Sequence, residues 1–121
     1  MEKYYTPKIE EFHVGFEFEK EWEDGSWSKE ILEVDELKDI EEEMLPITRV
    51  KYLDKEDIES LGFSIFENKT RYKKYKKNNY ILGHYGVKTV IIWDVAGELF
   101  DGEIKNKSEL KKLLKQLKII E

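Results

Sequence analysis

The sequence predicts an α+β domain: a mostly antiparallel β-sheet of meanders and hairpins, a C-terminal amphipathic helix packed on it, and short acidic helices in the N-terminal half. Short apolar or alternating runs, separated by turn residues, recur along the chain in the pattern of antiparallel strands. Leucines at helical spacing near the C-terminus form one apolar stripe. We therefore expect a single domain over residues 1–121 with about six to eight short strands.

Composition limits the class of protein. Charged residues make up 40% of the chain, but 13% are aromatic and can build a core, which argues against disorder. There is no cysteine, so disulfides and thiolate metal sites are excluded. We expect no signal peptide, because no apolar region follows Met1–Tyr5, and no membrane span, because no apolar run reaches the ~18 residues that one needs. We expect a cytoplasmic location and no membrane partner.

The net charge of −6 is unevenly distributed. Residues 1–60 contain 8 Lys/Arg and 20 Asp/Glu, a balance of −12, whereas residues 61–121 contain 13 and 7, a balance of +6. Such a chain can present a basic face to an anion, or pair its halves within the fold or across a subunit contact. Segregated, solvated surface charge is the simpler explanation. Edge strands and this charge division also allow a homo-oligomer.

The N-terminal residues predict an extended arm followed by a hairpin. Met1–Lys8 is polar and aromatic, and its tyrosines are expected to anchor it. Apolar residues alternate with polar ones within Ile9–Trp22, which predicts a half-buried strand. The dipeptide Asp24-Gly25 is a strong hairpin signal. Trp27–Val34 is then the returning strand.

The middle of the chain predicts two acidic helices around a strand. Asp35–Met44 has apolar residues on one helical face, and Pro46 ends it. Ile47–Leu53 alternates as a strand does. Asp54–Leu61 begins with a capping-box variant, and Gly62 supplies a C-terminal stop.

The C-terminal half predicts a meander of short strands. Strands are expected within Arg71–Lys77 and Tyr80–Tyr85, with a turn at Asn78-Asn79 between them. The β-branched run Val90–Trp93 predicts a buried strand that ends in a core tryptophan.

A final hairpin and a helix close the chain. Asp94–Gly97 predicts a turn, and Gly102 predicts a bulge or a bend in the strand that follows. Asn106 can cap a helix in which Glu109 completes a capping box. The stripe of this helix comprises Leu110, Leu113, Leu114 and Leu117.

Three stretches resemble a family of small uncharacterised proteins of phages and mobile elements of Bacteroidetes. They are Tyr5–Glu17, Val50–Gly62 and Ile104–Leu117, which together span most of the chain. The resemblance implies a phage accessory protein in a bacterial host cytoplasm. It implies no activity, so it transfers no catalytic residue. Proteins of this kind are often non-enzymatic binders, including inhibitors of host defence.

No catalytic or metal-binding motif is present. His13 and His84 are the only histidines, and neither has a second histidine four positions away, as a helical metal site would need. The carboxylates are explained by helix caps and solvated faces. There is no nucleophile elbow, phosphate loop or dinucleotide fingerprint. We expect no catalytic residue, no metal and no cofactor, and therefore a protein that is not an enzyme.

The run Arg71–Lys77 alternates cations with aromatic rings. Cations suit a phosphate, and rings suit a stacked base, so this run predicts an anionic or nucleotide ligand. The expected ligand-binding residues are Arg49, Lys51, Arg71, Tyr72, Lys74, Tyr75 and His84. The alternative, favoured on general grounds, is an exposed edge strand kept from aggregating by its lysines. Duplex DNA is not an expected partner, since one basic strand on an acidic protein neutralises few phosphates.

Two other functions remain open on the sequence. In the first, the acidic segment Asp35–Glu43 covers a basic surface of a host protein in the manner of a nucleic-acid mimic, and Trp22 or Trp27 anchors the interface. Core packing across the hairpin is the commoner role for these two indoles. In the second, the chain is a minor virion or assembly protein.

Overall fold

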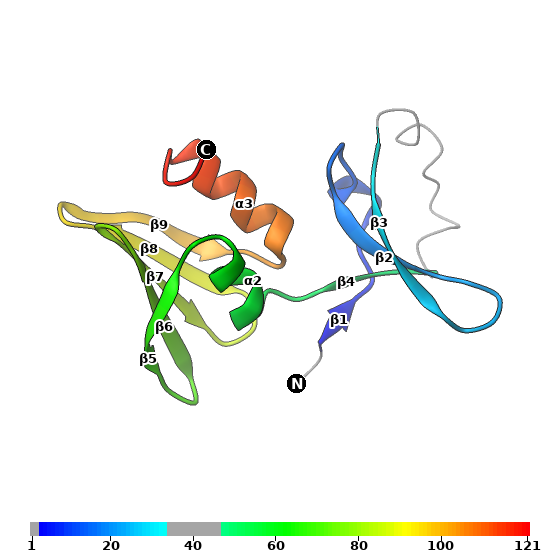
Figure 1. The fold of residues 1–121 in the computed structure, drawn as a ribbon, viewed down its shortest axis with the longest axis horizontal. Helices are drawn as coiled ribbons and strands as arrows, with labels where there is room; N and C mark the ends of the chain where they lie inside the picture. The colour runs from blue at the N-terminus through cyan, green and yellow to red at the C-terminus, as the bar shows by residue number, and fades with distance from the viewer. Residues whose placement is uncertain (1–2, 34–46) are drawn as a thin grey trace. The chain divides into compact units, whose positions relative to one another are not determined.

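A computed structural model of the chain describes residues 3–33 and 47–121. The chain divides into two compact units, Met1–Lys51 and Tyr52–Glu121, which we call the N-terminal and the C-terminal unit. The described residues form antiparallel sheets of four and five strands and a C-terminal helix (Figure 1), which confirms the α+β, mostly-sheet class. The nine strands of the described residues lie in two sheets rather than in the one expected. The single domain over residues 1–121 stays a prediction.

The N-terminal unit contains a sheet with the strand order β1-β4-β2-β3. Its elements are β1 (Tyr4–Tyr5), a 3₁₀ helix (Ile9–Glu11), β2 (Glu17–Glu21), β3 (Trp27–Ile31) and β4 (Thr48–Lys51). Tyr4 pairs with Lys51 and Tyr5 with Val50, which confirms that the two tyrosines anchor the arm. The core side chains are Phe12, Phe16, Phe18, Leu32 and Val50, with Tyr5 packed against them.

The strand expected within Ile9–Trp22 begins only at Glu17. Gly15 turns the backbone there, with φ at +89°, and its N–H donates to the carbonyl of Leu32 over 2.8 Å. Glycine adopts this left-handed conformation at little cost. Val14, an inward position in the alternating pattern, is consequently 50% exposed.

The hairpin between β2 and β3 turns at Asp24-Gly25, as predicted. Gly25 has φ at +84°. Asp24 Oδ1 accepts hydrogen bonds from the backbone N–H of Ser26 at 3.0 Å and from its hydroxyl at 2.6 Å. The hydroxyl bond is the main reason that the pKa of the Asp24 carboxyl lies below its usual value.

The C-terminal unit contains a five-stranded meander in which the strands lie side by side in sequence order. These strands are β5 (Ser64–Asn68), β6 (Tyr72–Lys77), β7 (Tyr80–Tyr85), β8 (Thr89–Asp94) and β9 (Gly97–Glu103). Asn78, at φ +54°, forms the predicted turn between β6 and β7. Asp94 forms the next predicted turn, where its Oδ1 accepts from the backbone N–H of Gly97 over 3.0 Å. The β8–β9 register shifts between Ile92 and Trp93 rather than at Gly102.

Both described α-helices begin at the predicted caps. In α2 (Lys55–Ser60), Asp54 Oδ1 accepts from the N–H of Asp57 over 2.9 Å, and the carboxylate of Asp57 accepts from the N–H of Asp54 over 3.4 Å. Gly62, at φ +99°, follows the end of this helix. The capping box predicted for Asn106 and Glu109, at the start of the second α-helix of this unit, is only partly formed.

In α3 (Lys107–Gln116), Asn106 Oδ1 accepts from the N–H of Glu109 over 2.9 Å, as expected. Glu109 Oε1 accepts from the N–H of Lys105 over 2.6 Å, one residue before the usual capping-box partner. Asn106 thereby satisfies one of the N–H donors in the first turn of the helix.

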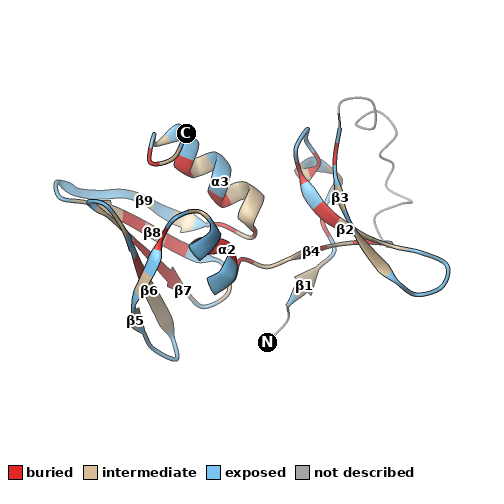
Figure 2. Ribbon diagram, in the orientation of Figure 1, coloured by how far each residue is buried: buried red, intermediate tan, exposed pale blue. Residues whose placement is uncertain are grey.

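Both helices pack on one face of the five-stranded sheet. Ile58 from α2 joins Leu110 and Leu114 from α3, and all three are fully buried. Figure 2 shows buried residues along β7, β8 and α3. The other buried members of this core are Leu53, Phe63, Tyr75, Leu82, Val90, Ile92, Ile104 and Ile119. Replacing either buried leucine by alanine is expected to cost about 2–5 kcal/mol.

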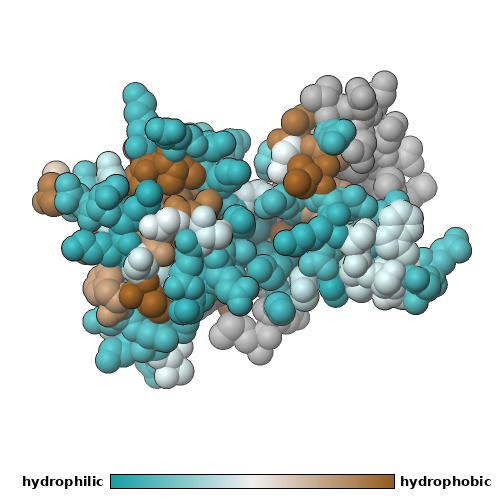
Figure 3. All heavy atoms as spheres, viewed as in Figure 1, coloured by the Kyte–Doolittle hydropathy of each residue, from teal (hydrophilic) through white to brown (hydrophobic). Residues whose placement is uncertain are grey.

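The visible surface of the described residues is largely hydrophilic, with small hydrophobic patches (Figure 3). None of the helices in residues 3–33 and 47–121 has the length and apolar character that crossing a bilayer takes. The acidic helix predicted over Asp35–Met44 lies outside the described residues. The other predicted strands and helices occur in the predicted order along the chain.

Candidate functional site

The five-stranded sheet has a second face, opposite α2 and α3, which we call the outer face. Side chains alternate between the two faces along a strand, and residues directly opposite each other on neighbouring strands share a face. Val90 and Ile92 point into the core, so Trp93 points outward. Tyr75 likewise points inward. Lys74 is one position before it and Tyr72 three positions before it, so both lie on the outer face.

Three aromatic rings gather on the outer face. Tyr72 lies opposite Tyr85, with ring centroids 5.4 Å apart. Trp93 and Tyr85 both reach over Gly83: a Cβ on this glycine would lie 2.6 Å from Tyr85 Cε1 and 3.2 Å from Trp93 Cζ3. Gly83 therefore lets the two rings approach the sheet backbone closely. All three rings are half-buried, so part of each remains open to solvent.

The ammonium group of Lys74 lies among these rings. Its Nζ is 5.6 Å from the ring centroid of Tyr72 and 5.8 Å from that of Trp93, within the outer range of cation–π contact. We call Tyr72, Lys74, Tyr85 and Trp93 the outer-face cluster. It combines flat surfaces for stacking with a positive charge at the same place.

Glu67 on β5 borders the cluster. Its carboxylate is 3.8 Å from Lys74 Nζ, and both side chains are about a third exposed. A hydrogen bond to the Glu67 carboxylate is also the main cause of the raised pKa of the Tyr72 hydroxyl. Exposed ion pairs of this kind contribute only about 0–1 kcal/mol. Lys74 can therefore exchange this partner for an anionic ligand at little cost.

The structure removes two expected ligand-binding residues from the accessible surface. Tyr75 is fully buried beneath the helices, and burial raises the pKa of its hydroxyl to about 12. Its hydroxyl is buried without a hydrogen-bond partner among the described residues. His84 is also buried: its Nε2 lies 2.9 Å from the carbonyl oxygen of Val87, and burial lowers its pKa. Neither side chain can meet a ligand on the outer face.

The alternative explanation of the basic strand as an edge strand is wrong. Strand β6 pairs with β5 on one side and with β7 on the other. Its lysines therefore do not protect an open edge. Arg71 precedes β6 and is exposed.

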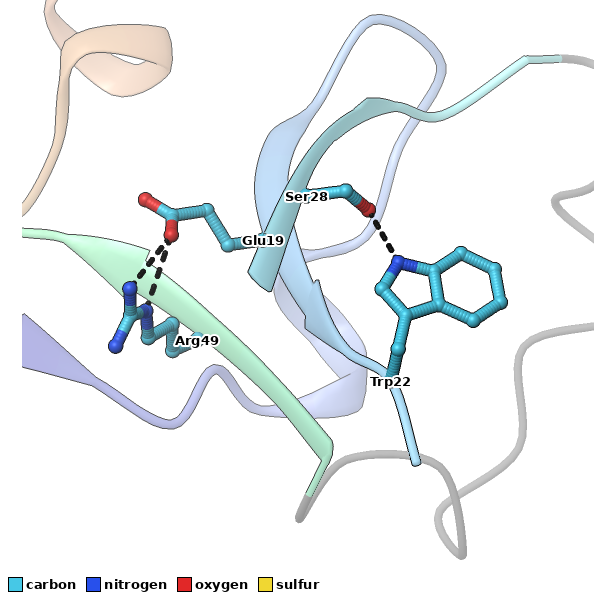
Figure 4. Close-up of polar contacts among 4 residues, drawn as sticks. All are labelled: Glu19, Trp22, Ser28 and Arg49. Atoms are coloured by element: carbon cyan, nitrogen blue, oxygen red, sulfur yellow. Dashed lines mark hydrogen bonds and ion pairs between the residues drawn. The ribbon is translucent and has the colours of Figure 1, made fainter. Parts of the chain in front are cut away.

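Arg49 and Lys51 belong to the N-terminal unit, where Arg49 already has partners. Its Nε and Nη2 donate to Glu19 Oε1 over 3.1 and 2.8 Å (Figure 4). Its guanidinium carbon lies 3.8 Å from the ring centroid of Tyr4 and 4.0 Å from that of Trp27. These contacts connect β4 to each of the other three strands of the sheet, so Arg49 acts as a structural clamp. They also half-bury Trp27, one of the two expected interface anchors.

Trp22, the other expected anchor, is 48% exposed. Its Nε1 donates to Ser28 Oγ over 2.8 Å (Figure 4), and the Nζ of Lys20 lies 4.7 Å from its ring centroid. The indole is thus held in one orientation at the surface.

Sequence reasoning missed two members of the outer-face cluster. The sequence pattern places Trp93 in the core and gives no signal for a binding role of Tyr85. Strand parity was the signal that could have found them: within an alternating strand, an inward Ile92 requires an outward Trp93. The β-branched run of β8 shows no alternation of polar and apolar residues, because both of its faces are apolar, so the sequence does not reveal which residues face outward.

Among residues 3–33 and 47–121, no group of three His, Asp or Glu side chains could hold a metal ion. The outer-face cluster offers stacking and charge, which are features of binding. No protein-family model, curated protein or solved structure matches this chain.

Proposed function

We propose that this chain is a non-enzymatic phage accessory protein that binds a nucleotide-like, phosphate-bearing ligand on the outer-face cluster and so blocks a target of the host. The observation that carries the proposal is the position of Lys74 Nζ, 5.6 and 5.8 Å from two ring centroids. When the phosphate of a nucleotide contacts the Lys74 ammonium, the base of the same nucleotide can stack on the ring of Tyr72 or Trp93.

The charge of the C-terminal unit favours such a ligand. Residues 52–121 contain 14 Lys/Arg and 11 Asp/Glu, a balance of +3, whereas residues 1–51 contain 7 and 16, a balance of −9. The whole chain is therefore acidic, but the C-terminal unit, which contains the outer-face cluster, has a net positive charge.

The expected affinity for one nucleotide is weak. Stacking of a base on an aromatic ring contributes about 1–3 kcal/mol. A hydrogen bond to a charged group contributes about 1.5–3 kcal/mol. The middle of their sum, about 2.5–6 kcal/mol before the entropy of association is subtracted, corresponds to a dissociation constant of about a millimolar, so binding is no tighter than this order. The ligand must therefore be titrated at millimolar concentration.

A titration followed by amide NMR, with AMP as the first ligand, tests the proposal. We expect shifts at residues of β6, β7 and β8, and we expect Lys74→Glu to abolish them. Lys77→Glu makes the same charge change on the same strand but on the opposite face, and should leave them in place. Shifts that persist in Lys74→Glu, or that fall on other elements, would show that the outer-face cluster is not the site.

A second candidate function rests on the exposed indole of Trp22. A rigid, half-exposed tryptophan is typical of an interface anchor. In this alternative the protein inhibits a host protein, and Trp22→Ala releases a partner captured from host lysate. Trp27→Phe is the matched control, because Trp27 is already packed against Arg49.

A further inference from the structure

A row of carboxylates lies beside the outer-face cluster. Strand β9 pairs with β8 so that Glu98 lies opposite Trp93 and Asp101 opposite Ile91, on the same face. Glu103 continues the row, and its carboxylate is 3.7 Å from Lys88 Nζ. All three acidic side chains are exposed. The outer face thus changes from cationic at β6, through aromatic rings, to anionic at β9.

This order determines how a charged aromatic ligand can lie. We propose, on the basis of the function proposed above, that the ligand is a single nucleotide, or the end of a strand, whose base carries an exocyclic amino group. Its phosphate contacts Lys74, its base stacks on Trp93, and the amino group of the base donates to Glu98.

The acidic flanks restrict the ligand to one nucleotide. Neighbouring strands are about 4.8 Å apart, so β9 lies about 14 Å from β6 across the sheet. A second phosphate beyond the base would approach Glu98 and Asp101 within roughly one Debye length, where repulsion is still felt. On the other flank, Glu67 already lies 3.8 Å from Lys74. The phosphates of a polynucleotide that crosses the outer face would therefore be repelled by Glu67 on one side and by Glu98 and Asp101 on the other.

The same carboxylates select the base. An ionised carboxylate accepts hydrogen bonds but cannot donate them. The amino groups of adenine and cytosine are suitable donors, and acidic side chains contact the cytosine amino group in this way in DNA recognition. Uracil presents a carbonyl at the corresponding position, which the carboxylate repels. AMP and CMP are therefore expected to bind about tenfold tighter than UMP.

Amide NMR titrations with AMP, CMP, UMP and a ten-residue oligoadenylate test this inference. In the wild-type chain we expect the preference for AMP over UMP, and no tighter binding of the oligoadenylate than of AMP. In Glu98→Lys the new ammonium donates instead of accepting, so the AMP-to-UMP ratio should fall below one. Glu121→Lys makes the same charge change at the exposed C-terminal residue and should preserve the ratio.

The outcomes separate the two proposals. Equal affinities for AMP and UMP, an unchanged ratio in Glu98→Lys, or an oligoadenylate that binds tenfold tighter than AMP would overturn the selectivity. In each of those cases Lys74→Glu would still abolish binding, so the proposed function would survive. Absence of any shift with all four ligands would overturn both.

Discussion

Replacing Gly83 by alanine directly tests the packing of the outer-face cluster. The added Cβ would lie 2.6 Å from Tyr85 Cε1, 3.1 Å from its hydroxyl oxygen and 3.2 Å from Trp93 Cζ3. Carbon atoms in contact prefer about 3.5–4.0 Å, so the nearest overlap is close to one ångström. The rings must therefore move away from the sheet.

The expected cost follows from two opposing terms. Overpacking of this kind typically destabilises by about 1–3 kcal/mol. Alanine also restricts the unfolded chain relative to glycine, which returns about 0.4–1 kcal/mol when the native backbone accepts it. Gly83 does not have a positive φ, so this gain applies. We expect a net loss of roughly 0.5–2 kcal/mol in the free energy of unfolding.

Urea denaturation in two backgrounds measures this cost. In Tyr85→Ala the atoms nearest the new methyl group are absent, so Gly83→Ala should cost less than it does in the wild type. The difference is the coupling energy of a double-mutant cycle. Equal costs in the two backgrounds would refute the close approach of Tyr85 to Gly83. Gly83→Ala should also weaken AMP binding, because it displaces both Tyr85 and Trp93.

Two further predictions concern polar groups outside the cluster. Burial lowers the pKa of His84 in the folded chain, so its contribution to stability is fully present above the unfolded value of about 6.5 and is lost as pH falls below it. The urea concentration at the unfolding midpoint should fall between pH 7.5 and pH 5. His84→Gln should make this fall smaller, whereas the control His13→Gln, at an exposed position, should leave it as in the wild type. Identical pH profiles for His84→Gln and the wild type would contradict the prediction. Arg49→Lys keeps the charge but loses the planar group between Tyr4 and Trp27, and should cost about 1–2 kcal/mol in denaturant unfolding, at ~0.5–1 kcal/mol for each ring contact. A variant as stable as the wild type would show that Arg49 is not a clamp.

Local sequence signals predicted the secondary structure well where short-range chemistry decides it. Asp54 and Asn106 cap their helices, and Gly25 and Asn78 take the positive φ that their turns require. Each feature depends on residues within about four positions in the chain, so the sequence contains the necessary information. The start of β2 was misplaced because alternation continues through the turn at Gly15.

The candidate site was predicted only in part, since its members are distant in sequence. Tyr72 and Lys74 were identified from their own strand. Tyr75, one position further on, was grouped with them although its side chain faces the core.

By itself, therefore, the sequence determined the class of fold, the helix caps and most of the turns. The tertiary structure decided the division into two sheets, the internal position of β6 and the meeting of Lys74 with Trp93. The physical reason is that strand pairing sets which faces coincide, and pairing depends on contacts between strands rather than on the residues of any one strand.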